Sequence, residues 1–340
     1  MKKIITFGEI LLRLSTERHL RISQATNFTA SYGGGEFNVA VSLANYGMDT
    51  AFVTRLPVND IGESALQEIR RAGVGTDHII FGGDRLGIYF LETGASMRGS
   101  KVVYDRSHSA MAQIEVGTID WESVFRDAQW FHWSGVTPAI SAQAAAVCLE
   151  AVKAAHRMGL TVSADLNYRS KLWKYGKEPK DIMPGLLQYS HIILGDLDTA
   201  FFMCGKEKKD PDYNKDVTLQ KLYDTLFDSF PHLRFTATTL RYSHNASLQG
   251  IGGILYDGNS VYRSTTREID PVVDRVGSGD AFMGGLIYGM LQYHGDHGKT
   301  IEFASAACCL KHTFLGDLNR ASVEEVERLA GGDSSGLVSR

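Results

Sequence analysis

The strongest chemical signal lies near the carboxyl end of the chain, where Gly277, Ser278 and Gly279 precede Asp280. Small residues let the backbone approach a ligand closely, and a helix that begins here would point its first free N–H groups outward. These amides predict a cradle for an anion. An acid in the first helical turn gains from the helix dipole, but Asp280 also lies where the anion would bind. This pairing suits phosphoryl transfer, in which Asp280 accepts the proton of an attacking hydroxyl while the amides hold phosphate charge.

A Gly-x-Gly pattern alone would equally fit a structural helix cap with an acidic first turn. The longer run over residues 274–285 favours the catalytic interpretation. A carboxylate of ordinary pKa is a weak base, but the proton leaves late in a loose transition state, so strong basicity is not required. The sequence therefore predicts a general base at Asp280, for which the pKa of an ordinary carboxylate suffices.

Strands alternate with helices along most of the chain, and several expected strands end in Gly, Ser or Asp. This alternation predicts an α/β fold with a parallel sheet covered on both faces and ligands beyond the carboxyl ends of its strands. The expected strands cover residues 3–7, 50–54, 129–133, 160–164, 191–194 and 235–239, with a hairpin over 251–263. The expected helices cover residues 36–46, 62–71, 141–158, 280–292, 300–313 and 322–329.

Two stretches break this alternation. Residues 11–32 contain no clear helix, and residues 84–110 contain two strand-like runs separated by a glycine-bounded segment. We expect both to form a small β-sheet lid, with the α/β core made of residues 1–10, 33–83 and 111–335. Ordinary loop insertions are the alternative. The polar residues 204–216 predict a solvated loop.

Composition excludes several classes of function. The chain has 340 residues, with 35 Lys and Arg against 39 Asp and Glu. It therefore lacks the excess of basic residues that would indicate a nucleic-acid or membrane partner. No apolar run is long enough to span a bilayer, and the opening one stops at Gly8, too soon for a signal peptide. Small buried thiols in a reducing, cytoplasmic protein are favoured over zinc or disulfide sites because no CxxC pair occurs among Cys148, Cys204, Cys308 and Cys309.

The run over residues 274–285 resembles the carboxyl-terminal signature of the PfkB/ribokinase family of carbohydrate kinases. Residues 33–40 resemble the family's amino-terminal glycine motif, with Glu36 where the broad motif has Gly. Three further segments resemble the branch that phosphorylates keto-deoxy sugar acids; they are residues 103–110, 132–139 and 165–173. Each piece is short, but the five occur in family order over nearly the whole chain.

This resemblance implies a ribokinase-like three-layer core with a small β lid, ATP as phosphoryl donor and Mg²⁺ bridging the phosphates. It places the catalytic base at Asp280 and the anion hole at residues 277–279. It further implies sugar contacts from Gly34 and Asn38 and a keto-deoxy-acid pocket formed by Tyr89, Tyr104, Arg106 and Arg169.

A physical argument also favours an acidic substrate. A neutral sugar needs only neutral donors and acceptors, whereas a carboxylate is bound strongly by guanidinium groups. Arg106 and Arg169 both lie in motif-bearing segments and therefore favour a sugar acid. The alternatives are surface or ion-pair roles for the arginines, and simple strand packing for Tyr89 and Tyr104.

Three segments depart from the family pattern. Many relatives carry Asn-x-x-Glu where this chain has residues 195–198, so Asp198 stands in for the Glu that handles metal and phosphate. Residues 238–245, which include Thr239, replace the usual glycine-containing nucleotide loop, and Arg241 within them is either a phosphate contact or solvated. Asp274 and nearby carbonyls match a potassium site of some relatives, which makes K⁺ an expected cofactor.

The resulting hypothesis is an ATP-dependent kinase that phosphorylates the 6-hydroxyl of 2-keto-3-deoxygluconate. Within the family, a fructokinase or a 5-keto-2-deoxygluconate kinase is the alternative. Outside it are a sugar-acid sensor without turnover and a dehydrogenase, whose Gly-x-Gly-x-x-Gly would need Gly at Phe282. Apolar residues on an outer face of the lid strands predict a homodimer or larger oligomer.

Overall fold

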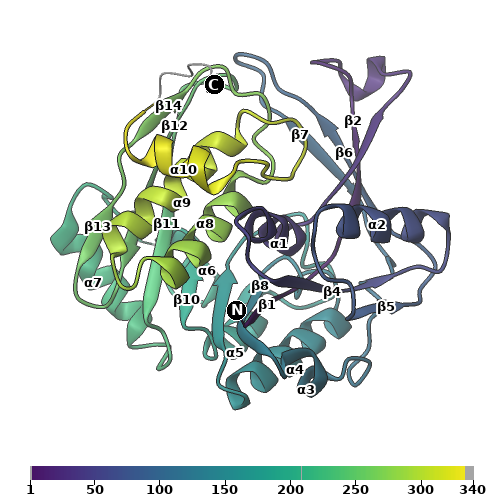
Figure 1. Ribbon diagram of the computed structural model, residues 1–340, viewed down its shortest axis with the longest axis horizontal. Helices are drawn as coiled ribbons and strands as arrows, with labels where there is room; N and C mark the ends of the chain where they lie inside the picture. Colours follow the sequence, from purple (N-terminus) through teal and green to yellow (C-terminus); the bar gives the residue numbers. More distant parts are fainter. Residues whose placement is uncertain (1, 208, 334–340) are drawn as a thin grey trace.

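The computed structural model describes residues 2–207 and 209–333. Two sheets form the molecule, a large one crossed by helices on both faces and a small one that rises from its edge (Figure 1). The large sheet has the strand order β13-β12-β11-β10-β9-β8-β1-β4-β5, and β14 pairs with β12. Neighbouring strands are parallel from β5 through β11, whereas β12, β13 and β14 join antiparallel.

The strands of the large sheet are β1 (Lys3–Phe7), β4 (Thr50–Leu56), β5 (Ile79–Phe81), β8 (Ala128–Ser134), β9 (Thr161–Asp165), β10 (Ile192–Leu194), β11 (Phe235–Ser243), β12 (Gln249–Tyr256), β13 (Val261–Arg263) and β14 (Arg267–Ile269). The helices are α1 (Gly35–Asn45), α2 (Asp60–Arg71), α3 (Trp121–Phe125), α4 (Ala142–Arg157), α5 (Pro179–Leu187), α6 (Leu197–Met203), α7 (Asp216–Phe227), α8 (Ser278–Gln292), α9 (His297–Lys311) and α10 (Val323–Ala330).

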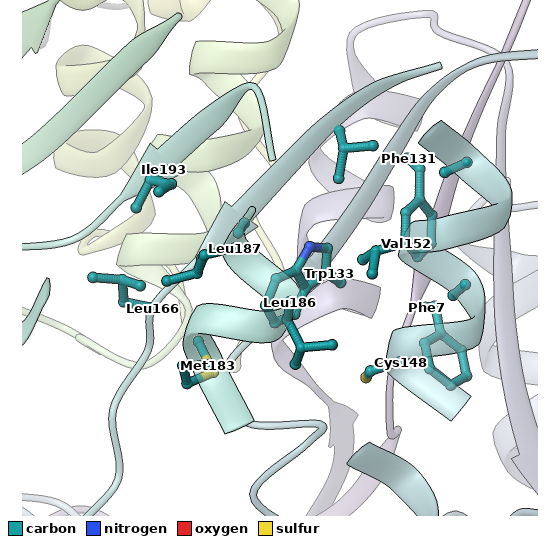
Figure 2. Close-up of a cluster of buried hydrophobic side chains, with 14 of the residues drawn as sticks. Phe7, Phe131, Trp133, Cys148, Val152, Leu166, Met183, Leu186, Leu187 and Ile193 are labelled. Carbon is teal, nitrogen blue, oxygen red and sulfur yellow. The ribbon is translucent and has the colours of Figure 1, made fainter. Parts of the chain in front are cut away.

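Alternating side chains of the buried strands divide the core between two faces of the sheet. On β1, Ile5 and Phe7 belong to the cluster under α3 to α7, and Ile4 belongs to the cluster under α1, α8, α9 and α10. Figure 2 shows part of the first cluster, in which Phe7, Phe131 and Trp133 lie against the side chains of α4 and α5. This is the three-layer arrangement predicted from the alternation of strands and helices.

Local signals explain where individual helices begin and end. Ser141 caps α4, since its Oγ accepts a hydrogen bond from the Ala144 amide at 3.0 Å, and Gly159 follows the helix in the left-handed region at φ 74°. The sequence did not predict α5, because Pro184 lies inside it and breaks the helical pattern. The short elements β5, β14, α3 and α6 escaped prediction as well, as did α7, which follows the polar loop.

The small sheet has the order β3-β2-β6-β7 and contains β2 (Leu11–Ser15), β3 (Thr29–Gly33), β6 (Gly87–Glu92) and β7 (Lys101–Asp105), with a short 3₁₀ turn over Ile22–Gln24. These strands come from the two stretches in which a lid was expected. Leu11 and Arg13 on β2 and Tyr89 and Leu91 on β6 are buried, so one face of this sheet turns toward the core. None of the helices in the described part of the chain is long and apolar enough to cross a membrane.

Candidate active site

A cleft of about 720 Å³ lies between the small sheet and the carboxyl ends of the central strands. Its lining comes from the lid strands, the segments after β9 and β10, and the first turns of α1 and α8. Twelve of the predicted site residues line it, namely Gly34, Asn38, Tyr89, Tyr104, Arg106, Arg169, Thr239, Arg241, Gly277, Ser278, Gly279 and Asp280. Asp198 and Asp274 are absent from this lining.

The amino terminus of α8 lies on the cleft, where the anion cradle was predicted. Gly277 caps the helix in the left-handed region at φ 82°, and a Cβ there would lie 1.9 Å from the carbonyl oxygen of Asp317, so only glycine fits. Within the described residues, the amides of Gly279 and Asp280 have no protein acceptor. Both donors lie on the cleft, where they can bind a charged oxygen.

Asp280 lines the cleft, as a general base that acts on a bound substrate must. Asn38 holds it in place by donating from Nδ2 to Oδ2 at 2.7 Å. Burial raises the pKa of Asp280 to about 7, the Asn38 hydrogen bond works against that rise, and the charge of Asp165 adds to it. Sequence alone does not reveal the burial that causes this rise.

Two further carboxyl groups belong to residues that line the cleft, Asp165 and Glu36. Burial raises the pKa of Asp165, at the end of β9, to about 6. Glu36 is buried, and its Oε1 accepts hydrogen bonds from the hydroxyls of Ser134 and Thr137, both at 2.7 Å. Glu36 therefore ties α1 to the end of β8, which accounts for an acid where the broad glycine motif has none.

The two arginines of the predicted acid pocket differ in their partners. Arg106 is buried and forms an ion pair with Glu9, so a carboxylate of the protein already neutralises its charge. Arg169 is exposed to the cleft, donates only to the Tyr168 carbonyl at 3.1 Å, and has no carboxylate partner among the described residues. The adjacent Lys171 donates to the carbonyl of Val102 on β7, which places this positive segment against the lid.

A second pair of arginines lies beside the anion cradle. Arg241 on β11 donates to Ser278 Oγ at 3.0 Å, and Arg275 donates weakly to Gln249 at 3.4 Å. Burial and the charge of Arg241 lower the pKa of Arg275. In the described part of the chain neither arginine has a carboxylate partner, so two like charges lie together beside the start of α8, an arrangement that suits an anionic ligand.

The segment after β10 differs from the prediction. Asp198 lies in the first turn of α6 outside the cleft lining, and the cleft carboxylate of this segment is Asp196, which caps α6 through the Thr199 amide at 2.8 Å. Helical geometry explains the difference, because residues two positions apart point to different sides of a helix.

A buried cluster of charges beneath the lid was missed by sequence reasoning. Arg13 on β2 binds Asp274 at 2.5 Å and Asp317 at 2.6 Å, and the Tyr89 hydroxyl donates to Asp317 at 2.6 Å. Tyr89 thus anchors the lid as well as lining the cleft. The only available signal was a charged residue inside the apolar run Leu11–Ser15.

Comparison with known proteins agrees with this architecture. A family model described as pfkB family carbohydrate kinase matches residues 1–225. A solved structure of 2-dehydro-3-deoxygluconokinase from Thermotoga maritima is 41% identical, with 98% of this chain and 100% of that chain covered and a TM-score of 0.92. A PfkB family carbohydrate kinase from Listeria grayi is 32% identical, with coverages of 97% and 100% and a TM-score of 0.89.

A third relative, 2-dehydro-3-deoxygalactonokinase from Haloferax volcanii, is 29% identical over 340 residues, 98% of each chain. The fold resemblance therefore extends over the described cleft as well as over the region that the family model matches. On this evidence the chain belongs to the pfkB family of carbohydrate kinases, with a ribokinase-like α/β core and a four-stranded lid sheet.

Proposed function

We propose that the protein transfers the γ-phosphoryl group of ATP to the 6-hydroxyl of 2-keto-3-deoxygluconate, giving 2-keto-3-deoxy-6-phosphogluconate and ADP. The observation that carries the proposal is a cleft carboxyl, Asp280, that burial tunes to a pKa of about 7 beside unpaired helix amides. A general base works best when its pKa lies near the operating pH.

The proposed step uses three groups of this chain. Asp280 removes the proton of the sugar hydroxyl, whose oxygen then forms a bond to the γ-phosphorus. The bond from that phosphorus to the bridging oxygen breaks, and ADP leaves with the electron pair. The amides of Gly279 and Asp280 would hold the equatorial oxygens, and Arg241 and Arg275 would balance the polyphosphate charge.

Magnesium fits this site only as a partner of the nucleotide. The described residues contain no group of three or more His, Cys, Asp or Glu side chains that could hold a metal by themselves. Mg²⁺ commonly uses one or two carboxylates, several waters and the substrate phosphates. Asp196, an exposed cleft carboxylate without a cationic partner among the described residues, is the residue we assign to it, and the ion would supply charge neutralisation.

The opposite part of the cleft supports an acidic sugar. The guanidinium of Arg169 lines the cleft and has no ion-pair partner among the described residues. Its positive charge lowers the pKa of Asp280. Two relatives are named as kinases of keto-deoxy sugar acids, 2-dehydro-3-deoxygluconokinase and 2-dehydro-3-deoxygalactonokinase. The prefix 2-dehydro in these names means the same as 2-keto. These two acids differ only in the configuration of one hydroxyl, so the galactonate acid is the second candidate substrate.

The test is ADP release with a matched panel of 2-keto-3-deoxygluconate, its galactonate epimer, 5-keto-2-deoxygluconate, fructose and ribose. We expect the highest kcat/KM with the first acid. Activity on fructose or ribose with none on the keto-deoxy acids would defeat the substrate assignment. Tight sugar-acid binding by calorimetry with no turnover on any member would favour a sensor instead.

Arg169→Ala should raise KM for the keto-deoxy acid by about 10–100-fold, because a charge-assisted hydrogen bond contributes about 1.5–3 kcal/mol. The variant should leave any residual activity on neutral sugars unchanged, since they lack the carboxylate. Arg169→Lys is the matched control. Its KM should lie between those of the wild type and Arg169→Ala, because Lys retains the charge without the forked geometry. Equal losses on acidic and neutral sugars would contradict the assignment of Arg169.

The pH dependence of kcat/KM should follow ionisation of Asp280. Only the deprotonated form accepts a proton, so kcat/KM should rise with pH up to about 7 and level off above it. Asp165→Asn should shift the rising part of the kcat/KM profile toward lower pH, because the negative charge of Asp165 raises the pKa of Asp280. A profile that stays flat down to pH 5 would exclude Asp280 as the titrating base.

A further inference from the structure

Lys311, the last residue of α9, has no exposed surface. Its Nζ donates to the carbonyl oxygens of Asp274 at 3.3 Å and Phe314 at 3.2 Å. No carboxylate oxygen among the described residues lies within ion-pair distance of this ammonium. A fully buried lysine whose bonding partners are main-chain carbonyls is unusual, since lysine is almost never fully buried unless paired.

The two carbonyls belong to segments that lie directly behind the anion cradle. Asp274 precedes the cap residue Gly277 by three positions, and its amide donates to the His312 carbonyl at 3.2 Å. The amide of Gly316 donates to the Asp274 carboxylate at 3.1 Å, and the carbonyl of Asp317 contacts Gly277. Lys311 therefore joins the turn before α8 to the segment that packs beneath it.

The four buried charged residues behind the anion cradle have a net charge of zero without an added ion. Arg13 and Lys311 supply two positive charges, and Asp274 and Asp317 supply two negative ones, all four residues being buried. Burial and the charge of Arg13 lower the pKa of Lys311, and the nearby carboxyl groups of Asp274, Asp317 and Asp280 oppose that effect. A further cation in this dry region would bring a positive charge without a counter-charge, at high cost.

Converging carbonyl oxygens are also what a potassium ion uses in place of its hydration shell. The residues present do not fit such an ion near Asp274, because Lys311 already bonds to that carbonyl and Arg13 to that carboxylate. We infer that the Lys311 ammonium takes the place of the monovalent cation expected beside Asp274, supports the anion cradle from behind, and makes the enzyme independent of K⁺. The inference rests on the proposed kinase function.

The first experiment measures wild-type ADP release and melting temperature in potassium, sodium and tetramethylammonium chloride at equal ionic strength. Both quantities should be the same in all three salts. A saturable rise of either one that is specific to potassium would overturn the inference. This arm needs no variant and is therefore immune to misfolding.

The second experiment uses Lys311→Ala, which removes the charge and leaves room behind the cradle. In tetramethylammonium, its kcat should fall by about 10–100-fold, and saturating potassium should restore much of the loss. Its melting temperature, measured without substrates, should rise with potassium concentration as expected for ligand binding to the folded state. That readout separates failure of the cation inference from failure of the kinase assignment.

Two matched variants complete the design. Lys311→Met keeps the stem and removes the charge, so it should lose activity in every salt with no recovery in potassium. Lys299→Ala removes an exposed lysine from the same helix and should show no dependence on the salt. A folded Lys311→Ala protein with neither a loss of activity nor a potassium response would show that Lys311 only packs, and would overturn the inference.

Discussion

Asp280→Asn should lower kcat by about 10²–10⁴-fold, the usual contribution of a positioned general base. The amide has nearly the same shape and can keep the contact with Asn38, but it cannot accept the hydroxyl proton. Binding of the nucleotide and of the sugar acid, measured by calorimetry, should change little. Retention of more than about a tenth of wild-type kcat would mean that another group is the base.

The same variant should be more stable than the wild type above pH 7. The folded carboxyl has its pKa raised from 3.8 to about 7, so the folded state binds more protons than the unfolded state between these pH values. Wild-type stability therefore falls as pH rises through this window, and the full penalty is present above pH 7. Because the group is partly exposed to the cleft, we expect a gain of only about 1–3 kcal/mol in Asp280→Asn at pH 8.

Urea unfolding at pH 8 and pH 5 measures this effect, and the gain should shrink at the lower pH. Asp60→Asn is the matched control, since Asp60 is also an acid in the first turn of a helix but is exposed. It should leave kcat unchanged and cost only a few tenths of a kcal/mol through the helix dipole. A loss of stability in Asp280→Asn at pH 8 would contradict the raised pKa.

Arg13→Met should destabilise the fold by about 3–5 kcal/mol, because it leaves two buried carboxylates without their cation. The free energy of unfolding from urea titration at pH 7 is the measurement. Arg85→Met is the control, since the Arg85 and Asp105 side chains are 35% and 53% exposed, and removing that pair should cost no more than about 1 kcal/mol.

A double variant isolates the electrostatic cause. Asp317→Asn added to Arg13→Met removes one of the stranded charges, so the pair should be less destabilised than the sum of the single variants. Strict additivity, or equal costs for Arg13→Met and Arg85→Met, would show that packing rather than charge stabilises this part of the lid.

The sequence predicted those features of the fold and the site that depend on local pattern. Alternating apolar runs and glycine stops predicted the layered sheet, and the helix that begins after Gly277 appears where expected. Contacts between distant residues could not be predicted in this way. Arg13 lies 261 positions from Asp274 and 304 from Asp317, and Arg106 lies 97 positions from Glu9, so no spacing rule links them.

The same limit applies to the electrostatics of the site. An arginine can bind a ligand's carboxylate only if the fold has not already paired it with a carboxylate of the protein, as the contrast between Arg106 and Arg169 shows. The raised pKa of Asp280 depends on its burial and on the charges of Asp165 and Asp317, which only the fold brings close to it. Motif position thus predicted most of the side chains that line the cleft, though not the choice of Asp196 over Asp198, and their charge environment required the structure.

The attachment of the lid has a consequence for how the two substrates bind. Arg13 and Tyr89 belong to lid strands, and both are bonded to Asp317, whose carbonyl packs against the cap of the anion cradle. A ligand that repositions the lid would therefore also reposition the backbone at the start of α8, which we propose receives the phosphate. Thermodynamic reciprocity then requires that sugar and nucleotide alter each other's affinity by the same factor, so the two dissociation constants belong to one coupled equilibrium.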